Sequence, residues 1–221
     1  MNSARQLLLT ASLALLVACT GQHAASPSAP EVVSDNSPIL NLGQRFLPVP
    51  GKNGMVVGPE QLAAEVGKQI MQAGGNAVDA AVATGFALAV TYPRAGNLAG
   101  GGFMLIHLAQ ENKETLIDYR ETAPAAAGRD LFLNDKGAVD KQREYFSHQS
   151  AGVPGTVAGL LYALENYGTM NRAQVLAPAI NLARNGFPLS FAHHYEFSAR
   201  ASQLRKNAEA ARLFLASDGS P

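Results

Sequence analysis

The chain has 221 residues, of which 47% are hydrophobic and 15% are charged, the balance of a soluble globular protein with a sizeable core. Seventeen Lys and Arg residues offset seventeen Asp and Glu residues, so no broad cationic field favours nucleic-acid binding. The single cysteine excludes an intrachain disulfide and the paired cysteines of structural zinc sites and C-x-x-C redox centres.

The N-terminal residues predict a secretory signal. Arg5 precedes an apolar run of 12 residues, 7–18, which suits a signal-peptide core and is shorter than the ~20 residues that span a bilayer. The run ends in Leu-Val-Ala before Cys19, and small residues before a cysteine resemble the lipobox of bacterial lipoproteins. In that interpretation Cys19 carries the lipid and begins the mature chain. The alternative is an ordinary cleavage site nearby and an inert thiol.

These features divide the chain into three parts. We assign residues 1–18 to the signal peptide, 19–50 to a flexible tether and 51–221 to the folded domain. The tether prediction rests on residues 20–38, which are rich in Ser, Ala and Pro. The protein is therefore expected to be exported, as a periplasmic or cell-envelope lipoprotein of a bacterium held at the membrane by its lipid alone.

The folded part begins with two predicted helices. A short edge strand is expected at 55–57. Apolar residues then recur at helical spacing from Glu60 to Ala73, and a Gly-Gly pair ends this amphipathic helix. Asn76 caps a second helix, with Asp79 in its first turn, that continues to about Val90 and is apolar on all sides. That helix is expected to be buried.

A glycine-rich segment and a hairpin follow. Residues 103–108 are predicted to form one strand, 111–113 a turn and 115–119 the returning strand. The polar stretch 121–149 has few apolar anchors and is expected to be irregular, with one helical turn at 130–133.

The remainder is predicted to be helical. The expected helices cover residues 156–167, 172–185, 191–206 and 208–215. Asn171 and Gln174 have the spacing of a capping box, and Pro178 is expected to kink or restart the helix that contains it.

Several candidate sites are weak on sequence alone. The run Gly100–Gly102 is followed by no Gly-Lys-Ser/Thr and enters a strand, so it matches neither nucleotide-binding fingerprint and is interpreted as a tight turn. His193 and His194 are adjacent, so on a helix they point about 100° apart and cannot face one metal ion. They are interpreted as a surface pair, and His107 and His148 are isolated. No metal site is predicted.

The sequence shows no nucleophile. It contains no Gly-x-Ser-x-Gly, and Thr156 and Thr169, which follow glycines, are interpreted as helix caps. Arg120, at the end of the second strand, has a guanidinium that can bind a carboxylate through two hydrogen bonds. The alternative is a structural ion pair with Asp118 or Glu121.

A series of motifs resembles the gamma-glutamyltranspeptidases, also called glutathione hydrolases. The motifs occur in order at residues 74–83, 96–104, 118–124, 152–159, 167–170 and 182–187. Together they extend over about residues 55–187. Such an ordered set is far more specific than any of its pieces.

The resemblance implies an α/β (α+β) fold, namely the αββα four-layer sandwich of N-terminal-nucleophile hydrolases, with only its N-terminal portion present here. Members are made as precursors that cleave themselves into a large and a small subunit. The nucleophile is the threonine freed at the start of the small subunit, whose α-amine can act as base. The chain is thus expected to be the N-terminal part of a large subunit, to contain no catalytic residue and to be inactive alone. Arg120 matches the arginine that grips the substrate α-carboxylate.

The implied activity is that of a gamma-glutamyltransferase and glutathione hydrolase without metal or organic cofactor. Its substrates are glutathione and other γ-glutamyl compounds, and its acceptors are amino acids, peptides or water. The expected protein partner is the small subunit of the same precursor, and no nucleic acid is expected. Two alternatives stay open: a cephalosporin (glutaryl) acylase of the same superfamily, and a non-catalytic lipid-anchored protein that binds a partner through a sheet edge.

Overall fold

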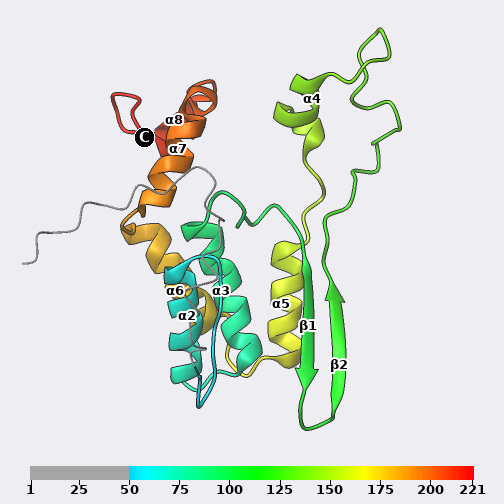
Figure 1. Ribbon diagram of the computed structural model, residues 1–221. Coiled ribbons are helices and arrows are strands. Elements are labelled where there is room, and N and C mark those ends of the chain that lie inside the picture. The colour runs from blue at the N-terminus through cyan, green and yellow to red at the C-terminus, as the bar shows by residue number, and fades with distance from the viewer. Residues whose placement is uncertain (1–49) are drawn as a thin grey trace, which may run out of the picture. The chain divides into compact units, whose positions relative to one another are not determined.

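The computed structural model describes residues 50–221 (Figure 1). The predicted signal peptide, Cys19 and all but the last residue of the predicted tether lie outside the described residues. The described residues combine helices with one two-stranded sheet, as the mixed α/β prediction requires. The elements in chain order are α2 (Gln61–Gln72), α3 (Ala77–Thr91), β1 (Phe103–Leu108), β2 (Lys113–Asp118), α4 (Lys141–Phe146), the 3-10 turn η1 (His148–Ser150), α5 (Thr156–Tyr167), α6 (Arg172–Asn185), α7 (Phe191–Leu204) and α8 (Ala208–Phe214).

The first helix, α2, is amphipathic as predicted. Its N-cap is Glu60, whose carboxylate accepts hydrogen bonds from the first free N–H groups of the helix. Ala63, Val66 and Ile70 are buried along one side. The helix ends before Gly74, whose φ of +97° lies in the region that favours glycine.

The second helix, α3, forms the centre of the core. Asn76 and Asp79 form the predicted start as a complete capping box, in which each side chain accepts a hydrogen bond from the other residue's backbone N–H. Nine of its 15 residues are buried, because α2, α5 and α6 all pack against it. The prediction that this helix is buried is therefore confirmed.

The hairpin of β1 and β2 is antiparallel, with Leu105 opposite Leu116. Asn112 makes the turn with a φ of +47°. The inner face, with Ile106 buried and Met104 and Ile117 half-buried, packs on the helical core.

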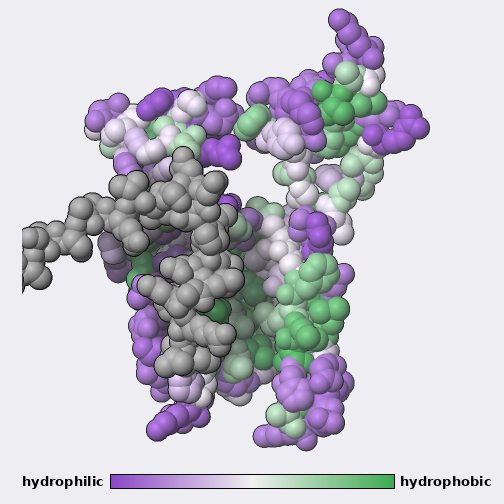
Figure 2. Space-filling model, in the orientation of Figure 1, coloured by the Kyte–Doolittle hydropathy of each residue, from purple (hydrophilic) through white to green (hydrophobic). Residues whose placement is uncertain are grey.

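The outer face of the hairpin is exposed and apolar. Phe103, Leu105 and Leu116 are 56%, 71% and 62% exposed. Figure 2 shows hydrophobic residues gathered over these strands. A two-stranded sheet does not make up a four-layer sandwich. The described residues therefore show a mixed α/β fold and not the predicted αββα layers.

Helices α5 and α6 agree with their predicted bounds, and Asn171 and Gln174 form the predicted capping box. Of the two outcomes predicted at Pro178, a kink or a restart, the restart is wrong, because α6 is one continuous helix. Val175 and Ala179, on either side of the proline, are both buried against the core. This packing holds the two halves in one helix although the proline removes one backbone hydrogen bond.

Two local expectations need correction. Residues 55–57 form no strand, because no neighbouring strand pairs with them in the described residues; Val56 instead packs on the core. The segment 121–149 is largely irregular as expected, but it contains α4, which the sequence analysis missed. Asp140 begins this short helix by accepting hydrogen bonds from the N–H groups of Gln142 and Arg143.

Helices α7 and α8 close the described chain and are confirmed with slightly earlier ends. Phe197 and Phe214 hold them together, with ring centroids 5.5 Å apart. Among residues 50–221, no helix is both long and apolar enough to cross a membrane.

Candidate functional site

Arg120 lies where the hairpin leaves β2, between two pairs of backbone hydrogen bonds. Before it, the Tyr119 N–H donates to the Gly102 carbonyl at 3.0 Å. After it, Thr122 and Val153 exchange two hydrogen bonds of 3.2 and 2.8 Å. The backbone on each side of Arg120 is therefore bonded to a different segment of the chain.

The two segments that flank Arg120 are also bonded to each other. The N–H groups of Gly155 and Thr156 both donate to the carbonyl of Gly100, at 2.9 and 3.0 Å. Residues 100–102, 119–122 and 152–156 thus form one closed junction. Three separate sequence motifs meet there. The run Gly100–Gly102 packs closely as predicted, since a Cβ at Gly101 would overlap the Glu121 backbone nitrogen. The predicted tight turn is wrong, because Gly102 pairs with Tyr119 and continues the hairpin instead.

The Arg120 side chain extends outward from this junction. It is 65% exposed, and its Nε lies 3.8 Å from a carboxylate oxygen of Glu121, beyond hydrogen-bond distance. The Arg120 backbone N–H donates to Asp118 at 3.0 Å. Within residues 50–221, no hydrogen bond engages the guanidinium nitrogens, so the fork that a carboxylate ligand needs is available.

Tyr119 points the opposite way, into the fold, as alternation along an extended chain requires. Its ring is half-buried and packs on the core. Burial raises the pKa of the Tyr119 hydroxyl, so the side chain stays neutral at physiological pH. At this junction the Arg120 guanidinium therefore points outward, and the neutral Tyr119 ring next to it packs on the core.

Asp79 is the completely buried carboxylate of the core. It accepts hydrogen bonds from the Asn76 N–H at 2.8 Å, from the Thr169 hydroxyl at 2.7 Å and from the N–H groups of Thr169 and Met170. Burial alone would raise its pKa, but these hydrogen bonds outweigh burial and lower the pKa below the usual value. Asp79 thus ties the start of α3 to the α5–α6 loop.

The two threonines considered as caps have other positions. Thr156 is the first residue of α5, and the N-cap is Gly155, which makes no side-chain cap. Thr169 lies before the α6 cap and donates its hydroxyl to Asp79. The cap interpretation of both is wrong, because neighbouring residues occupy the cap positions. The carboxylate that accepts from Thr169 is completely buried and bonded to three backbone N–H groups, so this contact is structural. Within residues 50–221 the Thr156 hydroxyl has no bond to a base.

The four histidines of the described residues lie in separate places or face different partners. His107 lies 3.0 Å from Glu114 across the hairpin, and His148 lies in η1. His194 is exposed as predicted, whereas His193 is half-buried. Among residues 50–221, no three His, Cys, Asp or Glu side chains are grouped as metal ligands would be.

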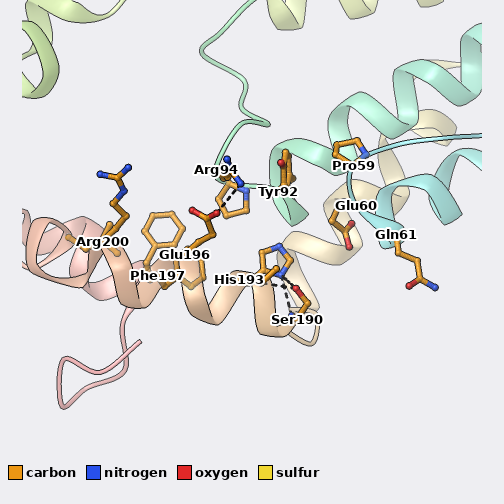
Figure 3. A pocket seen from close by; sticks show the side chains of 14 residues that line it. Pro59, Glu60, Gln61, Tyr92, Arg94, Ser190, His193, Glu196, Phe197 and Arg200 are labelled. Carbon is orange, nitrogen blue, oxygen red and sulfur yellow. Dashed lines mark hydrogen bonds and ion pairs between the residues drawn. The ribbon is translucent and has the colours of Figure 1, made fainter. Parts of the chain in front are cut away.

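A surface pocket of about 680 Å³ lies between α7, the start of α2 and the end of α3 (Figure 3). Arg94 and Glu196 pair in it at 2.9 Å. The Nε2 of His193 lies 2.8 Å from the Thr91 carbonyl, so this nitrogen donates, and Nδ1 accepts from the Ser190 N–H at 3.2 Å. With both ring nitrogens engaged, His193 is not a free base.

Arg120 is not among the residues that line this pocket. The predicted site residue and the pocket therefore belong to different parts of the fold. Sequence reasoning missed the pocket, since its lining comes from α2, α7, α8 and the segments that flank α2, α3 and α7, and no local pattern reveals their contacts. It also missed the tie between Asp79 and Thr169; the only signal was the acidic residue in the first turn of α3.

Comparison with known proteins extends the motif resemblance. Residues 63–221 match the family described as Gamma-glutamyltranspeptidase. The chain is 45% identical over 208 residues to the glutathione hydrolase proenzyme of Escherichia coli K12, covering 94% of the chain and 35% of that protein. It is 51% identical over 142 residues to the glutathione hydrolase proenzyme of Pseudomonas sp. strain A14, covering 64% and 24%.

A solved structure agrees with this result. The crystal structure of Helicobacter pylori gamma-glutamyltranspeptidase aligns with a TM-score of 0.75 at 39% identity, covering 78% of this chain and 50% of that one.

Another sequence relative has a different name. An Acylase ACY 1 proenzyme from Pseudomonas sp. strain V22 is 41% identical over 146 residues, covering 63% of the chain and 26% of that protein. The chain thus spans about a quarter to a third of the curated relatives it matches.

Proposed function

Because the chain belongs to the gamma-glutamyltranspeptidase family, we propose that the full-length protein hydrolyses glutathione and other γ-glutamyl amides and transfers the γ-glutamyl group to amino acids or peptides. The observation that carries the proposal is Arg120. Its guanidinium is exposed and without a hydrogen bond in the described chain, at a junction of three motif segments. Such a group suits the α-carboxylate of a γ-glutamyl substrate.

In the proposed reaction, Arg120 holds the substrate while a threonine outside this chain attacks the γ-carbonyl carbon. The threonine α-amine accepts the hydroxyl proton and returns it to the leaving amine, so the amide bond breaks as an ester to the enzyme forms. Water or an acceptor amine then attacks the ester and releases the threonine. Holding the carboxylate binds the substrate in the site before and during attack, which is the contribution of this chain.

The finer fold and assembly belong to the same proposal. The apolar outer face of the hairpin suits burial in the αββα sandwich, against further strands of the full-length protein. The relatives named as proenzymes support processing into two subunits. The small subunit then supplies the nucleophile.

Export and lipid attachment at Cys19 are proposed from the sequence of residues 1–19, which lie outside the described residues. The protein is expected in the periplasm or cell envelope, held to a membrane by its lipid. Replacing Cys19→Ser should move the protein from the membrane fraction to the soluble fraction. Membrane recovery equal to wild type would exclude the lipid at this residue.

The alternative that an observation favours is a glutaryl acylase, because an acylase proenzyme is among the relatives. The two activities differ in the substrate's α-amino group, which glutaryl compounds lack. Purified full-length protein should cleave L-γ-glutamyl-p-nitroanilide and be inactive on glutaryl-p-nitroanilide. Preference for the glutaryl substrate would favour the acylase, and inactivity on both would contradict an enzyme of either kind.

A further inference from the structure

Glycines from two separate motifs surround Tyr119. A Cβ at Gly159 would overlap Cγ of the tyrosine, and a Cβ at Gly155 would overlap its carbonyl oxygen. A Cβ at Gly102 would lie 3.0 Å from the ring. We call Gly102, Gly155 and Gly159 the glycine cradle.

The cradle is not explained by backbone conformation. None of its three glycines is among the positive-φ glycines, and Gly159 lies within the regular helix α5. An alanine would satisfy these dihedral angles and favour the helix at 159. The absence of a side chain therefore serves the close approach of Tyr119.

The position of Tyr119 determines that of Arg120. The two residues are adjacent in extended chain, so one points into the fold and the other outward. The tyrosine side chain is held by Gly102, Gly159 and the core, and Gly155 lies against the Tyr119 carbonyl. Hydrogen bonds at Tyr119 and Thr122 hold the backbone on each side of Arg120. The long Arg120 side chain is 65% exposed, and its ionic contact with Glu121 is 3.8 Å long, so it is held less firmly than the tyrosine ring.

We infer that Tyr119 and the glycine cradle are positioning residues that set the place and direction of the Arg120 guanidinium for the substrate carboxylate. This inference rests on the proposed role of Arg120. Packing alone holds the Tyr119 side chain in place, since its hydroxyl makes no hydrogen bond in the described part of the chain. Displacing the ring moves the cation that holds the substrate and leaves the distant nucleophile in place.

The test measures KM and kcat for L-γ-glutamyl-p-nitroanilide in the full-length protein, with processing followed on gels. Gly159→Ala should raise KM about 10-fold and leave kcat within about 2-fold of wild type. Tyr119→Leu should also raise KM and leave kcat little changed. This variant tests the inference if Gly159→Ala does not fold. Tyr119→Phe keeps the ring and should keep the wild-type KM.

Gly67→Ala is the matched control. Gly67 is also a buried helical glycine, and a Cβ there would overlap the Thr84 hydroxyl in the α2–α3 contact, away from Tyr119. It should lower stability without changing KM. A wild-type KM in both Gly159→Ala and Tyr119→Leu, with KM raised in Arg120→Ala, would overturn this inference alone. A wild-type KM in Arg120→Ala would overturn the proposed site and the inference together.

Discussion

At the residue scale, Asp79 and Arg120 differ in burial and in hydrogen bonding. Asp79 is completely buried and accepts hydrogen bonds from three backbone N–H groups and one hydroxyl. Arg120 is exposed, and its guanidinium makes no hydrogen bond within residues 50–221. A buried charge with every contact made stabilises the fold, whereas an exposed cation on a rigid backbone is available to a ligand.

Replacing Asp79→Asn should destabilise the full-length protein by about 2–3 kcal/mol at pH 7, since an amide turns donors toward N–H groups. The folded-state pKa of Asp79 is lowered, so its contribution is complete above the ordinary aspartate pKa of about 3.9 and is lost as the pH falls through the folded-state pKa. The difference in melting temperature between wild type and Asp79→Asn should therefore shrink below about pH 4.

Asp130→Asn provides the control, because Asp130 is 61% exposed and, within residues 50–221, its side chain pairs with Arg129 alone. It should change stability by less than about 0.5 kcal/mol at either pH. A melting difference for Asp79→Asn that stayed constant from pH 7 to pH 3 would show that Asp79 is not an ionised partner in the core.

At the element scale, local signals in the sequence were sufficient for several helix ends, although α4 was missed despite its local Asp140 cap. Asn76 and Asn171 each begin a helix with a capping box, and Gly74 and Gly186 end helices with positive φ. These signals are short-range, so they can be read without knowing the fold.

Other errors arise where residues distant in the sequence decide the structure. Val56 lies in an apolar run, but it packs on the core without a partner strand. Pro178 has a strong local signal for a break, which the burial of Val175 and Ala179 overrides. The contact between Tyr119 and Gly159 could not be predicted either, because the two residues are 40 positions apart and meet only in the folded chain.

At the scale of the whole molecule, the described residues are one part of a larger architecture in the relatives. The hairpin has a packed inner face and an apolar outer face, and Arg120 lies at its end. Motif order predicted the family, which residues 63–221 confirm. The role of Arg120 stays a prediction, because a side chain's ligand follows from neither burial nor motif order.

The most direct test compares wild type and Arg120→Ala on two substrates in the full-length protein, with Arg129→Ala, another exposed arginine, as control. The substrates are L-γ-glutamyl-p-nitroanilide and 4-aminobutyryl-p-nitroanilide, which lacks only the α-carboxylate. Removing either the guanidinium or the carboxylate should lower kcat/KM about 100-fold, and removing both should lower it little further. Equal losses from Arg120→Ala on both substrates would contradict the claim that Arg120 binds the carboxylate.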